Sequence, residues 1–163
     1  MLELAFYGAT AIAVFSTVMT VTNPNPVHAL LYLIVSLLAA AMLFFLLGAP
    51  FAAMLEVIVY AGAIMVLFVF VVMMLNLGSV VVDKERQLIA PRAWAGPAVL
   101  CLLLTAELAV LIAKGAPHPL AIVEVSAKQT AIALYGPYLL AVELASMLLL
   151  GGLVAAYHLG RRE

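Results

Sequence analysis

The stretch FAAMLEVIVYAGAIMVLFVFVVMMLN, residues Phe51 to Asn76, decides the fold. It is longer than the roughly 20 apolar residues that a helix needs to cross a bilayer, and Glu56 is its single charged residue. Glu56, Tyr60, Ala63 and Leu67 are spaced i, i+4, i+7 and i+11, so they share one face of an α-helix. The stretch therefore predicts a membrane-spanning helix with a carboxylate on one face.

Glu56 has two interpretations. A carboxylate inside a spanning helix costs roughly 2.5 kcal/mol or more unless it faces a partner or water, so its presence indicates function. Alternatively, Glu56 lies about 9 Å from the start of the helix, at 1.5 Å per residue, and its side chain reaches the membrane interface. The position alone favours neither interpretation.

Small residues follow Glu56 in Tyr60-Ala61-Gly62-Ala63, between β-branched residues on both sides. Glycine costs about 1 kcal/mol in a helix interior and is often placed where backbone must approach closely or bend. Close packing of helices through small residues is the favoured explanation. A local irregularity such as a π-bulge, which tends to mark functional sites, is the alternative, and periodicity does not separate the two.

The composition of the whole chain is that of a membrane protein. Of its 163 residues, 68% are hydrophobic and 9% are charged, whereas soluble domains are about 25% charged. The net charge of −1 gives no indication of a nucleic-acid partner. The single cysteine, Cys101, allows neither an intrachain disulfide nor a thiolate metal cluster.

Turn and cap residues divide the apolar sequence. Asn23 to Pro26 ends the first apolar run, and Asn25 suits an N-cap while Pro26 suits the first helical position. Gly48-Ala49-Pro50 forms a tight turn before the third run. Ser126 and Gln129 fit a capping box, which predicts a short surface helix through Leu134.

These boundaries predict an all-α integral membrane protein with five transmembrane helices and a short surface helix in the loop before the fifth. We expect residues 1–163 to form a single membrane domain. The expected spans are about 4–21, 27–47, 51–77, 94–113 and 137–158.

The distribution of lysine and arginine predicts the orientation. One side of the membrane receives five basic residues: Lys84, Arg86, Arg92, Arg161 and Arg162. The other side receives Lys114 and Lys128. We therefore expect a periplasmic N-terminus and a cytoplasmic C-terminus, which places Glu56 and Glu143 in the outer half and Glu107 near mid-membrane.

No residue pattern in the chain indicates redox chemistry of its own. His28, His118 and His158 lie at span ends or in loops, so a b-type haem has no axial pair. The sequence also lacks a Gly-rich phosphate loop, a metal-ligand cluster and a nucleophile with a base. We expect no cofactor on this chain.

The three intramembrane glutamates, Glu56, Glu107 and Glu143, remain. Each is a candidate proton-relay carboxylate, interfacial side chain or ion-pair partner of a neighbouring subunit. No lysine or arginine lies deep in a span to pair with these glutamates. The simplest way to offset their cost in the membrane is contact with other membrane subunits and water.

Three segments carry a resemblance to a known family. They are NPVHALLYLIVSLLA (Asn25–Ala39), LEVIVYAGAIMVLFVFVVMMLN (Leu55–Asn76) and GPYLLAVELASMLLLGGLVAAYHLGR (Gly136–Arg161). Together they resemble the J subunits of bacterial NADH-quinone oxidoreductase, respiratory complex I, and their mitochondrial counterpart, NADH dehydrogenase subunit 6. The likeness runs through most of the chain in the same order.

The resemblance implies a cofactor-free, non-catalytic membrane subunit of a proton-pumping NADH:quinone oxidoreductase in the bacterial inner membrane. It implies that FMN, iron–sulfur clusters, NADH and quinone are bound by other subunits. The implied partners are the K, H and A subunits, the antiporter-like subunits and membrane lipid, with no nucleic acid.

The resemblance also implies a role for the third helix. In the family this helix carries a π-bulge at the YAGA region, which interconverts with α-helix and opens or closes a water path for protons. The corresponding positions here are Tyr60, Gly62, Met65, Val66 and Phe68, with Glu56 and Glu143 as candidate proton-path carboxylates. Some family members carry an amide at the position of Glu56, which argues against an obligatory proton carrier.

Two other classes of function compete with this interpretation. A stand-alone ion or proton transporter predicts paired charges or an inverted repeat, and the sequence has neither. A purely structural membrane anchor would leave the glutamates and YAGA without a task. Native sizing after mild detergent extraction discriminates among the three.

Overall fold

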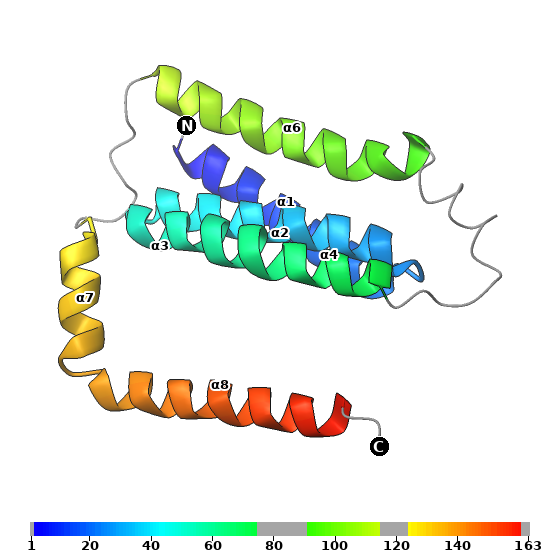
Figure 1. Ribbon diagram of the computed structural model, residues 1–163. Coiled ribbons are helices and arrows are strands. Elements are labelled where there is room, and N and C mark those ends of the chain that lie inside the picture. The colour runs from blue at the N-terminus through cyan, green and yellow to red at the C-terminus, as the bar shows by residue number, and fades with distance from the viewer. Residues whose placement is uncertain (1, 75–90, 115–123, 161–163) are drawn as a thin grey trace. The chain divides into compact units, whose positions relative to one another are not determined.

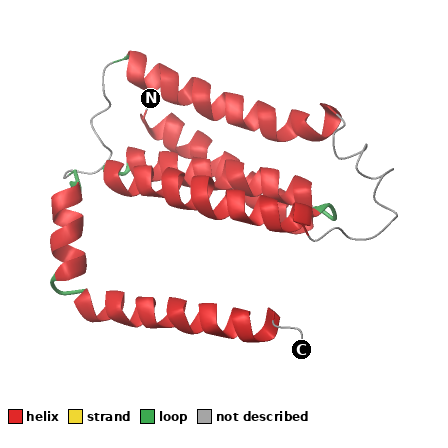
Figure 2. Ribbon diagram, in the orientation of Figure 1, coloured by secondary structure: helices red, strands yellow, loops and turns green. Residues whose placement is uncertain are grey.

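The computed structural model describes residues 2–74, 91–114 and 124–160, and all its regular elements there are helices (Figure 2). Within this described part, five helices are long and apolar enough to cross a membrane: Leu2–Thr22, Pro26–Leu46, Pro50–Val72, Trp94–Ala113 and Leu139–Gly160. The predicted all-α membrane fold is confirmed.

Two predicted span ends either differ from the structure or lie outside the described residues. Residues 75–77, at the predicted end of the third span, lie outside the described residues. The fifth helix begins at Leu139 and not at Pro137, because residues 136–138 form a turn. The chain divides into two compact units, Met1–Glu124 and Val125–Glu163, and the single membrane domain stays a prediction.

In the first unit, α1 (Leu2–Thr22) and α2 (Pro26–Leu46) form a hairpin (Figure 1). The Asn25 side chain caps α2, because its Oδ1 accepts the backbone N–H of Val27 at 3.0 Å and that of His28 at 3.5 Å. Pro26 occupies the first helical position, where its missing N–H costs nothing. The predicted cap is therefore present.

Small side chains let α1 and α2 approach each other closely. Ala5, Ala9 and Ser16 of α1 are buried, as is Ala39 of α2. The same packing brings two hydroxyl groups of neighbouring helices into contact, since Thr17 Oγ1 lies 2.7 Å from Ser36 Oγ.

The third span has three parts: α3 (Pro50–Leu55), the π-helix η1 (Glu56–Ile64) and α4 (Met65–Met74). All three pack against α2 (Figure 1). The turn into α3 depends on Gly48, whose φ of 83° lies in the left-handed region that glycine adopts without strain. Here Gly48 N–H donates to the Phe45 carbonyl at 3.1 Å, which ends α2.

The helix α6 (Pro91–Ala113) packs on α2 and α1. Its contact face is apolar, with Leu104 and Leu111 buried in the same core as α1 and α2. Gly96 lies on this face, and the Tyr32 hydroxyl of α2 occupies the place where a Cβ would be. The Tyr32 side chain of α2 thus packs directly against Gly96 of α6.

The second unit contains α7 (Ala127–Tyr135) and α8 (Leu139–Gly160). The predicted capping box is present: Ser126 Oγ accepts the Gln129 N–H at 3.3 Å, and Gln129 Oε1 accepts the Ser126 N–H at 3.0 Å. The helix that was expected before the fifth span is therefore confirmed. None of the residues of α8 is buried.

Candidate functional site

The third span changes its hydrogen-bond pattern inside the membrane. At the start of η1, the Glu56 N–H still donates to the Ala52 carbonyl, four residues back. At its end, the Met65 N–H donates to the Tyr60 carbonyl, five residues back, which is the π-helical pattern. Nine residues, Glu56–Ile64, belong to this segment. π-Helix is rare and mostly confined to single turns, so this segment is the most unusual backbone feature of the described chain.

The local sequence explains why α-helix is weak here. Val57, Ile58, Val59 and Ile64 are β-branched and lose rotamer freedom in an α-helix. Gly62 lowers the helix propensity further. An ideal Cβ built on Gly62 would lie 3.2 Å from the Val57 carbonyl oxygen, five residues back. A methyl group at residue 62 would therefore require the Val57 carbonyl to move by a few tenths of an ångström.

The explanation that the sequence favoured for this patch, helix packing through small residues, stays a prediction. Within the first unit Gly62 is exposed, and the Val57 carbonyl oxygen is the atom of the described residues that its ideal Cβ would meet. The irregularity, which was the alternative, is present. The shared face of Glu56, Tyr60, Ala63 and Leu67 is also wrong, because it assumed 3.6 residues per turn through a π-helical segment.

The candidate residues of the third span divide into one buried side chain and several exposed ones. Met65, the first residue after η1, is 2% exposed and belongs to the part of the span that packs on α2. In contrast, Tyr60, Val66 and Phe68 are 51%, 64% and 52% exposed. Glu56 is half-buried. Hence Met65 is the candidate of this span that is buried in the first unit, and the exposed candidates lie before and after it in the chain.

Glu143 lies on α8 and is exposed. Its backbone carbonyl accepts the Ser146 hydroxyl at 2.8 Å. Glu143 belongs to the second unit and Glu56 to the first.

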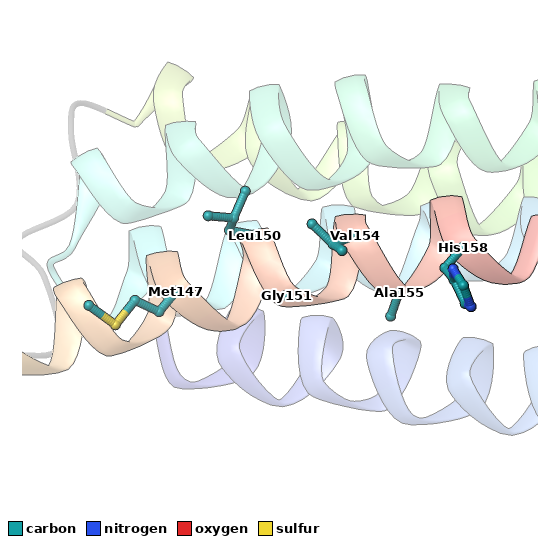
Figure 3. Close-up of a pocket in the computed structure, with 6 residues that line it drawn as sticks. All are labelled: Met147, Leu150, Gly151, Val154, Ala155 and His158. Atoms are coloured by element: carbon teal, nitrogen blue, oxygen red, sulfur yellow. The ribbon is translucent and has the colours of Figure 1, made fainter.

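Figure 3 shows an open apolar groove on one face of α8. Its side chains are those of Met147, Leu150, Gly151, Val154, Ala155 and His158. An ideal Cβ on Gly151 or Gly152 would meet no atom within 4 Å. These small residues thus leave an open face on this helix within the second unit.

The surroundings of Glu107 were not predicted from the sequence. Glu107 lies on α6 against Gly8 of α1, where an ideal Cβ would be 2.7 Å from its Oε1. Glu107 is also six residues before Ala113, the last residue of α6, and its depth near mid-membrane stays a prediction. A charged residue in an apolar run already marked Glu107 as a candidate. No local sequence pattern indicated that Glu107 would contact Gly8 of α1.

Among the described residues, no group of three or more His, Cys, Asp or Glu is placed to hold a metal ion. Four of the basic residues on which the orientation rests lie outside the described residues: Lys84, Arg86, Arg161 and Arg162.

The fold and this site define a polytopic α-helical membrane protein whose third span is interrupted by π-helix. The chain belongs to the family of NADH-ubiquinone/plastoquinone oxidoreductase chain 6, whose sequence model matches residues 16–159. This confirms the predicted resemblance.

Curated relatives match over nearly the whole chain. NADH-quinone oxidoreductase subunit J of Pseudomonas aeruginosa is 62% identical over 167 aligned residues, which cover 99% of this chain and 98% of the relative. The Escherichia coli K12 protein of the same name is 55% identical, over 99% of this chain and 88% of the relative. The Buchnera aphidicola protein from Schizaphis graminum is 45% identical, over 99% of both chains.

Proposed function

We propose that this chain is a non-catalytic membrane subunit of a proton-translocating NADH:quinone oxidoreductase, and that its third span gates a water path between the quinone site and the proton channels. The observation that carries the gate is the π-helix Glu56–Ile64 inside an apolar span of a member of this family. π-Helical segments tend to occur at functional sites because they are strained relative to α-helix.

The gate would work by a change in the helical register of the third span. A helix that returns from i→i−5 to i→i−4 bonding holds about one extra residue, and one residue at 3.6 per turn corresponds to about 100° of rotation. Conversion of η1 to α-helix would turn the following residues by that angle. Met65 would then leave α2, while Val66 and Phe68 would point in new directions.

The side chains of Met65, Val66 and Phe68 are apolar. A file of water molecules is broken when an apolar side chain enters it. In one state Val66 and Phe68 would close the path, and in the other they would leave it open. Tyr60 and Gly62 lie within the converting segment. Glu56, at its first residue, and Glu143, on the fifth span, are the carboxylates that would exchange protons with this water.

We also propose which partners surround this chain and in which membrane it lies. The exposed faces of η1, α4 and α8 would pack against the K, H, A and antiporter-like subunits and against lipid. The redox groups, FMN, iron–sulfur clusters, NADH and quinone, would lie on other subunits. The chain would lie in the bacterial inner membrane with its N-terminus in the periplasm and its C-terminus in the cytoplasm.

Gly62→Ala tests the gate. Alanine favours α-helix by about 0.8–1 kcal/mol relative to glycine, and its Cβ would crowd the Val57 carbonyl at 3.2 Å in the π form. A change of about 1 kcal/mol shifts a two-state ratio around fivefold. We expect the variant to assemble and to oxidise NADH with an artificial acceptor normally, while quinone-linked turnover and proton export both fall.

Gly160→Ala is the matched control, because its Cβ meets no atom within 4 Å and it is the last residue of α8, outside the groove. It adds the same methyl group to another span and should leave all three activities unchanged. Wild-type quinone reduction and proton export in an assembled Gly62→Ala variant would refute the gate. A small homo-oligomer without NADH oxidation after mild extraction would refute the assignment to the complex.

A further inference from the structure

The carboxyl group of Glu107 is seated on the backbone of α1. An ideal Cβ on Gly8 would lie 2.7 Å from Glu107 Oε1 and 3.4 Å from both Cδ and Oε2. Real Cβ atoms do not approach an oxygen as closely as 2.7 Å, so the carboxyl group occupies space that exists because residue 8 has no side chain.

The surroundings of this contact are apolar. Leu104 and Leu111, one turn before and one turn after Glu107 on α6, are buried, and so are Ala5 and Ala9 beside Gly8. Within the described residues, the Glu107 side chain has neither a hydrogen-bond nor an ion-pair partner. A carboxylate in such a place is costly unless it is neutralised.

Other titratable and charged groups lie on the helices packed here, and within the described residues none of them forms a hydrogen bond or an ion pair with the carboxyl group. α6 carries Arg92 and Cys101, and Lys114 follows its last residue, seven residues or about 10.5 Å along the helix from Glu107. On α1 they are Glu3 and Tyr7, and on α2 they are His28 and Tyr32, in the first two turns. Tyr32 packs on Gly96, eleven residues from Glu107 on α6.

Glu107 also lies at a defined depth. It is six residues before Ala113, Gly8 is six residues after Leu2, and Glu56 is six residues after Pro50. Consecutive spans alternate in direction, so these three helix ends face the same side of the membrane. Six residues correspond to about 9 Å of helix, and Glu107 therefore lies at the depth of Glu56 but against α1.

We propose that Glu107, seated on Gly8 between α6 and α1, is a proton-binding site in the membrane interior and that its carboxyl group carries a proton at neutral pH. The neutral acid removes the cost of a buried charge without a cationic partner. The site is separate from η1, and its existence does not depend on the proposed gate.

Carbodiimide chemistry tests this site in native membranes that carry the full chain. A protonated carboxyl group gives its proton to a carbodiimide nitrogen, and its oxygen adds to the central carbon. The acyl group of the resulting O-acylisourea then migrates from oxygen to nitrogen, which leaves a stable N-acylurea that contains every atom of the reagent. Peptide mass spectrometry identifies the modified residue.

We expect the apolar reagent dicyclohexylcarbodiimide to modify Glu107 at neutral pH and several-fold less at alkaline pH, where the proton is lost. At mildly acidic pH, where exposed carboxyl groups are partly protonated, a water-soluble carbodiimide should modify the exposed Glu3 and spare Glu107. Modification of Glu107 by the water-soluble reagent as readily as Glu3, or none by the apolar reagent at any pH, would overturn the proposal.

Gly8→Ala tests the geometry, since its methyl group would displace the carboxyl group. It should lower the apolar modification several-fold, whereas Gly152→Ala, with nothing within 4 Å of its Cβ, should not change it. Equal modification in both variants would remove Gly8 from the site. Glu107→Gln, which resembles the neutral acid, should keep wild-type assembly, and loss of assembly would instead indicate a charged, ion-paired Glu107.

Discussion

Thr17 Oγ1 and Ser36 Oγ lie 2.7 Å apart and join α1 to α2 by a side-chain hydrogen bond. Ser36 Oγ also donates to the Ala13 carbonyl of α1 at 3.3 Å. Hydrogen bonds between transmembrane helices contribute about 0.6 kcal/mol on average and at most about 1.7 kcal/mol. This pair therefore fixes the register of the two helices at a modest energy.

Ser36→Ala removes both of these contacts. We expect it to lower the unfolding free energy of the chain in mild detergent by about 0.6–1.7 kcal/mol, measured by circular dichroism during denaturant titration. Thr22→Val is the control, because the Thr22 hydroxyl bonds only to its own helix, at the Val18 carbonyl. Equal stability of the two variants would contradict the role of the Thr17–Ser36 contact.

Gly96→Ala should weaken the docking of α6. Its Cβ would fall on the Tyr32 hydroxyl, and overpacking of this kind costs about 1–3 kcal/mol. Tyr32→Phe removes the clashing oxygen and should restore much of the lost stability in the double variant, as read by the same titration. If the second substitution gives no recovery, Tyr32 and Gly96 are not in contact.

Met65→Cys reports the register of the third span. In a background with Cys101→Ala, we expect slow maleimide labelling of this thiol, because residue 65 is 2% exposed in the π form. Adding Gly62→Ala should speed the labelling, because conversion to α-helix turns residue 65 away from α2. Val66→Cys provides the comparison, since Val66 is already exposed. An unchanged rate at residue 65 would mean that Gly62→Ala leaves the register intact.

Glu56→Gln should leave assembly intact and lower proton-coupled turnover only in part, because an amide still hydrogen-bonds to water at this position. Quinone-linked proton export in membrane vesicles measures the effect. Glu3→Gln, in the exposed first turn of α1, is the control. Complete loss of export in an assembled Glu56→Gln variant would make Glu56 an obligatory proton carrier.

The expected orientation makes a prediction for reporter fusions. A reporter placed after Arg162 should be active in the cytoplasm, and one placed near His118 should be active in the periplasm. These positions lie outside the described residues, and the expectation rests on the excess of basic residues on one side. The opposite pattern would invert the topology and place Glu56 in the cytoplasmic half.

The elements of this fold could be predicted because each depends on residues that are close in sequence. Asn25 and Pro26 mark the start of α2, and Ser126 with Gln129 marks the start of α7, through contacts made within three residues. The apolar runs have the length that a bilayer requires. Such signals are local, and the structure follows them closely.

The π-helix and the helix contacts could not be derived in the same way. In Glu56–Ile64 the side chains are compatible with either bonding pattern, and apolar periodicity does not report whether an N–H donates four or five residues back. The contacts of Glu107 with Gly8 and of Tyr32 with Gly96 join residues far apart in sequence. They depend on which helices pack together, and no single helix encodes that choice.

The absence of any buried residue in α8 has a consequence for biogenesis. Within the second unit this apolar helix packs against α7 alone, so the rest of its surface, including Gly151 and Gly152, is left for protein or lipid from outside that unit to cover. We therefore expect the lifetime of newly made chains to depend on how soon α8 is captured by its neighbours in the assembly.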